Sequence, residues 1–167
     1  QGQFIDASKH WVGRGPGFQS PLGDNVLPLN SDVPFAVLAE PSSAWPSQPA
    51  RDQGYKLRGY RLDDARRPVL QYQFGRVLID DAPRAIKSGK EVSIERTLTL
   101  TVSPGEAIKL DHLYFRAAIG NKIEAGSDGL FTVDGWRLHV SNSKGTPLVR
   151  PAGNRMEVLA PVDLTGG

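Results

Sequence analysis

The 167-residue sequence contains no cysteine. This absence excludes disulfide bonds, thiolate metal sites and covalent haem attachment through a Cys-x-x-Cys-His motif. Long hydrophobic runs are also missing: nothing approaches the roughly 18 apolar residues that cross a bilayer, so we expect no transmembrane segment. The chain starts at Gln1 rather than at methionine. We expect that a signal peptide has been removed after export.

Charge of one sign is scarce as well. Lys and Arg number 20 and Asp and Glu 18, so the net charge is only +2 although the pI is about 9.0. A nucleic-acid-binding protein usually concentrates positive charge on one face, so this balance disfavours a nucleic-acid partner. The hydrophobic content of 39% is typical of a globular protein, and the length suits one domain.

Residue patterns for catalysis are sparse. The histidines His10, His112 and His139 stand in separate segments, and no Gly-x-Ser-x-Gly nucleophile motif occurs. Two adjacent acidic pairs, Asp63-Asp64 and Asp80-Asp81, are expected at a turn and at a strand end. Neighbours in a strand point to opposite faces, so neither pair forms an acid-base dyad. We predict that the protein is not an enzyme, and we expect no catalytic residue, no cofactor and no metal site.

The first 34 residues are rich in glycine and proline, and we expect an irregular arm over Gln1 to Pro34. The arm carries three aromatic residues, Phe4, Trp11 and Phe18. They either pin the arm across its own domain or dock on a partner protein. We predict that they belong to a partner-binding surface and that deleting the arm abolishes association while leaving the stability of the core nearly unchanged.

Residues 35–167 are predicted to form one domain of many short strands. Alternation with period 2 is clear in Val69 to Phe74 and in Glu91 to Val102, and turn dipeptides separate the segments that follow. This spacing predicts an all-β fold, a mostly antiparallel β-sandwich behind the N-terminal arm. The best helical candidate is a single turn near Ala82 to Lys87. Further strands are expected from 77 to 81, 113 to 119, 122 to 125, 130 to 133, 136 to 141, 147 to 150 and 155 to 164.

The apolar face of each strand predicts the core. The nine side chains expected to be buried are Val92, Ile94, Leu98, Leu100, Leu113, Phe115, Ala117, Val158 and Val162. We expect Thr97, Thr99 and Thr101 on the opposite, exposed face of their strand. Arg96 falls on the apolar face of the same strand. It must either reach solvent at the sheet rim or form a buried ion pair with an acid such as Glu124.

A basic cluster interleaved with tyrosines precedes these strands. By alternation Lys56, Arg58 and Tyr60 share one face, and Gly59 is a candidate for a β-bulge. The cluster is either a solvated outer face or a docking surface for an acidic partner. We predict the second, with Arg58, Tyr60 and Arg61 as partner-binding residues. The cluster consists of Lys56, Arg58, Arg61, Arg66 and Arg67, with Tyr55 and Tyr60 between them.

Two segments resemble a known family. GYRLDDARRPVLQYQFGRVLIDD is similar to the pattern GYxLDxxGRPxFxYxxGxVxVxD, and LYFRAAIGNKIEA is similar to LYFRxAxGxxI. Both patterns occur in a β-rich module of large exported planctomycete-type proteins, where it accompanies c-type cytochrome domains and domains like quinoprotein glucose/sorbosone dehydrogenases. The resemblance covers about residues 20 to 167. Arg66 stands where the family turn usually has glycine, and this chain has neither a haem motif nor a quinoprotein propeller.

The resemblance implies a periplasmic or otherwise extracytoplasmic setting, at the membrane surface. It favours a non-catalytic scaffolding subunit that docks on or stabilises a larger, membrane-associated electron-transfer complex. The alternative is a carbohydrate-binding module associated with sugar oxidation. That alternative needs two of the aromatics Trp45, Tyr60 and Trp136 to lie coplanar on one exposed face.

Overall fold

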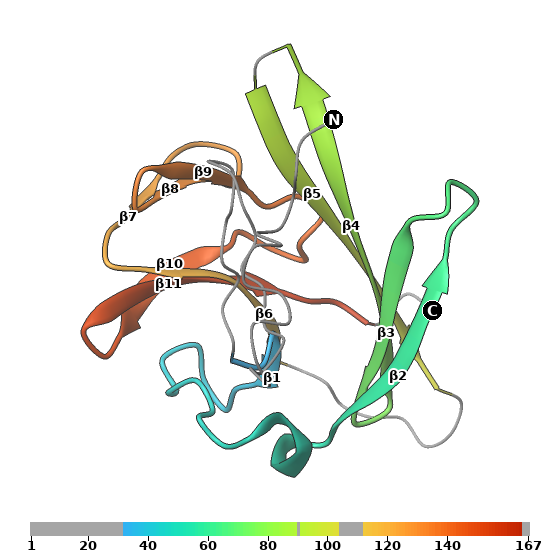
Figure 1. Cartoon of the computed structure of the whole chain (residues 1–167). Helices are drawn as coiled ribbons and strands as arrows, with labels where there is room; N and C mark the ends of the chain where they lie inside the picture. Colours follow the sequence, from blue (N-terminus) through green and yellow to red (C-terminus); the bar gives the residue numbers. More distant parts are fainter. Residues whose placement is uncertain (1–31, 90, 104–111, 165–167) are drawn as a thin grey trace, which may run out of the picture.

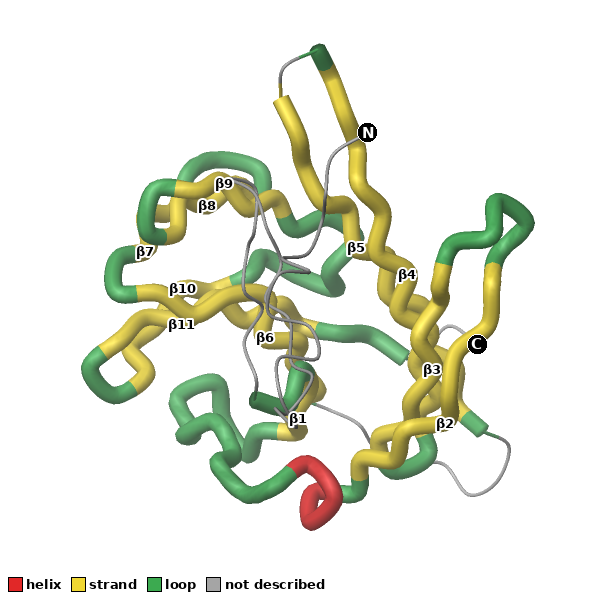
Figure 2. Tube along the Cα trace, viewed as in Figure 1, coloured by secondary structure: helices red, strands yellow, loops and turns green. Residues whose placement is uncertain are grey.

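The computed structural model of the chain describes residues 32–89, 91–103 and 112–164. Within these ranges the protein is built from antiparallel β-strands, and the short 3-10 turn η2 (Ala50–Gln53) is the one helical segment (Figure 2). The prediction of an all-β, mostly antiparallel sandwich is confirmed. The predictions for residues 1–31 of the arm, with Phe4, Trp11 and Phe18, lie outside the described residues, whereas residues 32–34 are described and Val33 is buried.

The first sheet has the strand order β2-β3-β4-β5 and is on the right in Figure 1. Its strands are β2 (Tyr55–Leu62), β3 (Pro68–Phe74), β4 (Val77–Ser88) and β5 (Glu91–Val102). Successive strands pair as hairpins, as the sequence predicted for the segments around Gly75. The sheet is thus made entirely from neighbours in the sequence.

The second sheet has the order β1-β6-β11-β10, and the third has the order β7-β8-β9. In the second sheet β6 and β11 are the central strands, so both edges of β6 are paired, and its side chains are buried or half-buried on both faces. The second sheet consists of β1 (Phe35–Val37), β6 (Leu113–Gly120), β10 (Leu148–Ala152) and β11 (Arg155–Pro161). The third consists of β7 (Ile123–Ala125), β8 (Leu130–Val133) and β9 (Trp136–His139).

Three apolar clusters hold the sheets together. The first fills the space between the first and second sheets around Phe35, Val77, Ile79 and Leu113, with Leu98, Leu100, Phe115 and Val162 packed against it. The second lies where residues 38–45 cover β6 and β11, around Leu38, Tyr114 and Leu159. The third joins the second and third sheets around Phe131, Val133 and Val158. The domain is therefore a sandwich with a small third layer.

The predicted register of β5 is confirmed, because Leu98 and Leu100 pack on the core whereas Thr97, Thr99 and Thr101 are exposed. The predicted burial of Val92 and Ile94 is wrong. These side chains are 46% and 56% exposed, because the ends of β4 and β5 project beyond the second sheet (Figure 1). Period-2 alternation assigns a face to each residue, but it does not tell how far the opposing sheet extends.

The helical turn predicted near Ala82 to Lys87 is also wrong, since β4 continues to Ser88 and pairs with β5 along its whole length. Ser103 donates its N–H to the carbonyl of Arg76, and residues in an antiparallel strand alternate between its two sides. By this alternation the nitrogen of Pro83 faces away from β5. Proline therefore removes no bond from the β4–β5 ladder and is tolerated.

The turn between β2 and β3 follows the chemistry expected at Asp63. Its Oδ1 accepts hydrogen bonds from the backbone N–H of Ala65 at 3.0 Å and of Arg67 at 2.9 Å. Arg66 has a φ of 60°, the left-handed region in which glycine is unstrained. The departure from glycine noted in the sequence is thus accommodated by an arginine in a strained backbone conformation.

Candidate functional site

A groove of about 650 Å³ opens between the first and second sheets. We call it the inter-sheet groove. Tyrosines of the first sheet line one wall, residues 116–119 of β6 line the other, and residues 32–34 lie along it. Its polar lining is mostly cationic. Its lining includes Asp32, Tyr55, Leu57, Tyr72, Arg96, Arg116 and Trp136.

The alternation of side chains along β5 places Arg96 in this groove, where it pairs with Asp81 of the neighbouring strand β4. Its Nε lies 2.9 Å from Asp81 Oδ1, and its Nη2 lies 2.5 Å from Asp81 Oδ2. Burial lowers the pKa of Arg96, but the hydrogen bonds and the charge of Asp81 more than offset this, so the pKa is raised. The predicted ion pair exists, but its partner is Asp81 and not Glu124, which pairs with Lys122.

Two tyrosines pack under the groove. The Tyr55 hydroxyl donates to the carbonyl oxygen of Phe35 at 2.5 Å and accepts the N–H of the same residue at 2.9 Å, which ties β2 to β1. The buried Tyr72 hydroxyl has no hydrogen-bond partner among the described residues. Burial is the main cause that raises the pKa of both phenols. Neither phenol therefore ionises near neutral pH.

A buried ionic network lies behind the groove, and reasoning from the sequence missed it. Glu157 on β11 is 1% exposed and accepts from the Nε of Arg150 at 2.6 Å. Its other oxygen lies 2.8 Å from Arg116 Nε, an ion pair without hydrogen-bond geometry. Arg116 also contacts Asp32 at 2.8 Å and stacks on Trp45 at 4.5 Å. The available signal was the charge at positions 116 and 157 inside two apolar strands.

This network fixes the loop that precedes the first sheet. Arg150 donates to the carbonyl oxygens of Pro41 and Ser43, the second at 2.7 Å. Burial is the main cause that lowers the pKa of Arg116, opposed by the charges of Glu157 and Asp32. Each charge in the network faces an opposite charge. The arrangement is that of a structural brace, because its opposite charges are matched and Arg150 ties β10 to the loop at Pro41 and Ser43.

The predicted partner-binding strand β2 has a β-bulge between Leu57 and Gly59. Leu57 pairs with Tyr72, and Tyr60 pairs with Leu70, so these side chains lie on the groove side of the sheet. Lys56 pairs with Gln73, and Arg61 pairs with Val69, on the other side. The prediction that Lys56 and Tyr60 share one face is wrong, because the bulge shifts the alternation by one residue.

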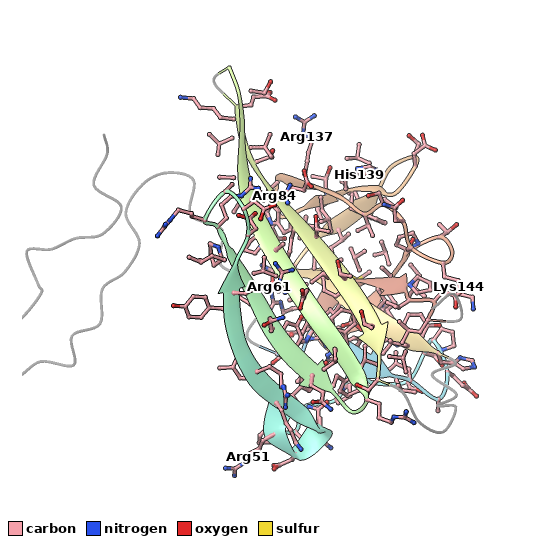
Figure 3. All side chains as sticks on the ribbon, turned by 90° about the vertical axis from the view of Figure 1, so that its right-hand side faces the viewer. Arg51, Arg61, Arg84, Arg137, His139 and Lys144 are labelled. Carbon is pink, nitrogen blue, oxygen red and sulfur yellow. The ribbon has the colours of Figure 1, made fainter. Side chains whose placement is uncertain are left out.

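The bulge creates an exposed apolar surface, which we call the β2 patch. Leu57 is 81% exposed and Tyr60 is 69% exposed, and Leu62 and Leu70 beside them are exposed as well. Of the predicted partner-binding residues, Tyr60 belongs to this patch and Arg58 adjoins it as the extra residue of the bulge. Arg61 lies on the opposite face, where its Nη2 contacts Asp80 at 2.9 Å (Figure 3).

The remaining cations of the cluster are engaged locally or are exposed. Arg67 pairs with Asp63 at 2.8 Å across the turn. The hydrogen bond from Gln71 and the contact with Arg61 lower the pKa of Asp80. The basic cluster is therefore divided between the turn and the two faces of the sheet, so it does not form one continuous basic surface.

The three aromatics named for carbohydrate binding lie in different surroundings. Trp45 packs against the second cluster, donates its indole N–H to Val33 O at 3.1 Å and carries Arg116 over its ring. Trp136 packs against the third cluster, and Tyr60 is exposed on β2. Carbohydrate binding therefore stays a prediction. The three aromatics lie in different parts of the domain and do not form one shared platform for a sugar.

No cluster of three His, Cys, Asp or Glu side chains suited to a metal ion occurs within residues 32–89, 91–103 and 112–164. In the same described ranges, no helix has the length and apolar character needed to cross a membrane. His139 is exposed and its Nε2 lies 3.1 Å from Asp128 O, as expected for a solvent-facing residue, while His10 lies outside the described residues.

Comparisons with models of protein families, with curated proteins and with solved structures found no match to this chain. The resemblance to the exported planctomycete-type module therefore stays a prediction from the two sequence motifs.

Proposed function

We propose that this chain is a non-catalytic interaction module of the extracytoplasmic space, which docks on or stabilises a larger, membrane-associated electron-transfer complex. The observation that carries the proposal is the β2 patch. Leu57, Tyr60 and Leu62 occupy one face of an edge strand, and no described segment covers them. Contiguous exposed apolar surface of this kind is a feature of binding sites on soluble proteins.

The charges around the patch suggest the chemistry of the partner. Arg58 is exposed beside it as the extra residue of the bulge, whereas Lys56 is exposed on the opposite face of the same strand. Arg96 and Arg116 in the inter-sheet groove, in contrast, are already paired with acids. Arg96 pairs with Asp81. Arg116 pairs with Asp32 and Glu157. An apolar centre bordered by the cation of Arg58 fits a partner whose apolar spot is bordered by a carboxylate. The electron-transfer setting comes from the sequence resemblance alone.

The proposal is tested by capture from detergent-solubilised membranes of the native host, with covalent haem staining of the captured proteins. Leu57→Ser and Tyr60→Ala should each lower the capture of a haem protein roughly tenfold, because aromatic and apolar centres carry most binding energy. Leu130→Ser is the control, since Leu130 is an exposed leucine outside the patch, on β8 of the third sheet.

The unfolding midpoint in urea checks that each variant is folded. Equal capture by the wild type, Leu57→Ser and Leu130→Ser would show that the β2 patch is not the docking surface. Capture without any haem protein would remove the electron-transfer part of the proposal.

A further inference from the structure

The edges of the three sheets are protected to very different degrees. A free edge presents unpaired N–H and C=O groups, and proteins usually shorten, bulge or interrupt such strands. Among the described strands, the edges β1 and β7 have 3 residues each, β9 has 4, and β10 has 5 and contains Pro151. The edge strand β2 is broken by its bulge. Among the edge strands that the structure describes, β5 alone is long, with 12 residues, and also has neither a proline nor a shift of register.

The backbone groups on the open side of β5 belong to its even-numbered residues. Ser103 donates its N–H to Arg76 O, so the odd-numbered positions face β4. The even positions from Val92 to Val102 therefore direct their N–H and C=O groups outward. Within the described residues β4 is the one strand that pairs with β5.

The side chains of β5 are complementary to those of a second β5 strand. When two copies run antiparallel with Thr97 opposite Thr97, Val92 faces Val102 and Ile94 faces Leu100. On the other face Ser93 meets Thr101, and Glu95 meets Thr99. Apolar residues meet apolar ones, hydroxyls meet hydroxyls or a carboxylate, and no two like charges stand directly opposite each other.

This pairing would also cover exposed apolar side chains. Val92, Ile94 and Val102 are all exposed on the projecting hairpin or at its base. Arg96 would lie opposite Leu98, and its charge is already matched by Asp81. The one described ion pair at the tip joins Glu91 to Arg137 at 4.0 Å, and both side chains are exposed and free to move aside.

We propose that two copies of this chain associate through β5 about a two-fold axis at Thr97, so that the two β2-β3-β4-β5 sheets become one continuous sheet. Isologous pairing of this kind is the commonest symmetry of soluble oligomers. It would add about twelve backbone hydrogen bonds between the copies. Because β2 lies at the opposite edge of the sheet, both β2 patches remain free (Figure 1).

The absence of cysteine from the chain permits a sharp test of this register. Thr97 would form a non-hydrogen-bonded pair with its copy, with Cα atoms about 4.5 Å apart, within the range of a disulfide. Thr99 and its copy would be about 13 Å apart, because each lies opposite Glu95 and is four residues from the other. Under mild oxidation the full-length Thr97→Cys variant should become a covalent dimer, and Thr99→Cys should not.

Association without a crosslink is measured by sedimentation velocity over a wide range of concentration. The full chain should dimerise, and Ile94→Lys should weaken the dimer roughly tenfold or more, since it places a charge opposite Leu100. Ile86→Lys is the matched control, because Ile86 is an exposed isoleucine of the same hairpin on the other face.

Three outcomes would overturn the proposal. The first is a monomer at every concentration. The second is crosslinking of Thr99→Cys as fast as of Thr97→Cys, which shows random collision or another register. The third is a monomer that dimerises only when residues 1–31 are removed, which shows that the arm of the same chain covers β5.

Discussion

Removing the charge of Glu157 should destabilise the fold more than most single substitutions. Glu157 is 1% exposed and faces two arginines, with Arg150 Nη2 at 2.6 Å and Arg116 Nε at 2.8 Å. Glu157→Gln keeps the size of the side chain but leaves both guanidinium groups without their buried counter-charge. Breaking a buried pair in this way costs about 3–5 kcal/mol.

The lower part of that range is expected, because Arg116 keeps Asp32 and Arg150 keeps two backbone carbonyls. A loss of about 3 kcal/mol lowers the midpoint of thermal unfolding by roughly 6–12 °C for a domain of this size. Urea unfolding should show a lower midpoint at an unchanged m value. The matched control is Glu124→Gln, an exposed acid paired with Lys122, which should leave the midpoint unchanged. A loss below about 1 kcal/mol for Glu157→Gln would refute a buried network, because a solvated pair contributes no more than that.

Further perturbations test separate parts of the structure. Gly129→Ala should destabilise the third sheet strongly, because a Cβ at Gly129 would clash with the Val140 carbonyl oxygen. Gly153 also has a positive φ but faces open space, so Gly153→Ala should cost only the backbone strain of about 1 kcal/mol. Equal urea midpoints for the two variants would contradict this. Stability should fall as the pH rises above about 10, because burial raises the pKa of Tyr55 and Tyr72 in the folded state while the unfolded chain ionises. A urea midpoint that stays the same between about pH 9 and about pH 11 would count against it. Arg58→Glu should weaken partner association, and so should salt of roughly 0.5 M, which screens the charge. A truncation lacking residues 1–31 should lose association while its unfolding midpoint stays almost unchanged. If the truncated protein loses several kcal/mol of stability, then Phe4, Trp11 and Phe18 contribute to the core instead.

Much of the first sheet was predictable because its signals are local. The alternation of β3 and β5 and the turn around Asp63 each depend on residues close together in the sequence, and the hairpins and the register of Leu98 and Leu100 followed from them. The bulge at Gly59 was foreseen as an option. The sequence did not predict that the bulge puts Lys56 and Tyr60 on opposite faces of β2. Simple alternation assigns faces by counting residues, and a bulge inserts one extra residue into the count.

The features that failed depend on contacts that are distant in the sequence. Alternation placed Arg96 on the core face and required a partner, but it did not select Asp81 from the available acids. The brace of Arg116, Glu157 and Arg150 joins β6, β11 and β10, and the sequence alone does not reveal that β6 pairs with β11. The same holds for Val92 and Ile94, whose exposure depends on where the second sheet ends.

We have proposed that this chain is a docking module of a membrane-associated electron-transfer assembly. The measurement that tests it most directly is native co-purification of the full-length chain from solubilised membranes, with identification of its companions and a visible absorption spectrum of the sample. We expect a stable companion that carries covalent haem and that no longer co-purifies when Leu57→Ser disrupts the β2 patch. Recovery of the chain alone from membranes that contain such haem proteins would contradict it.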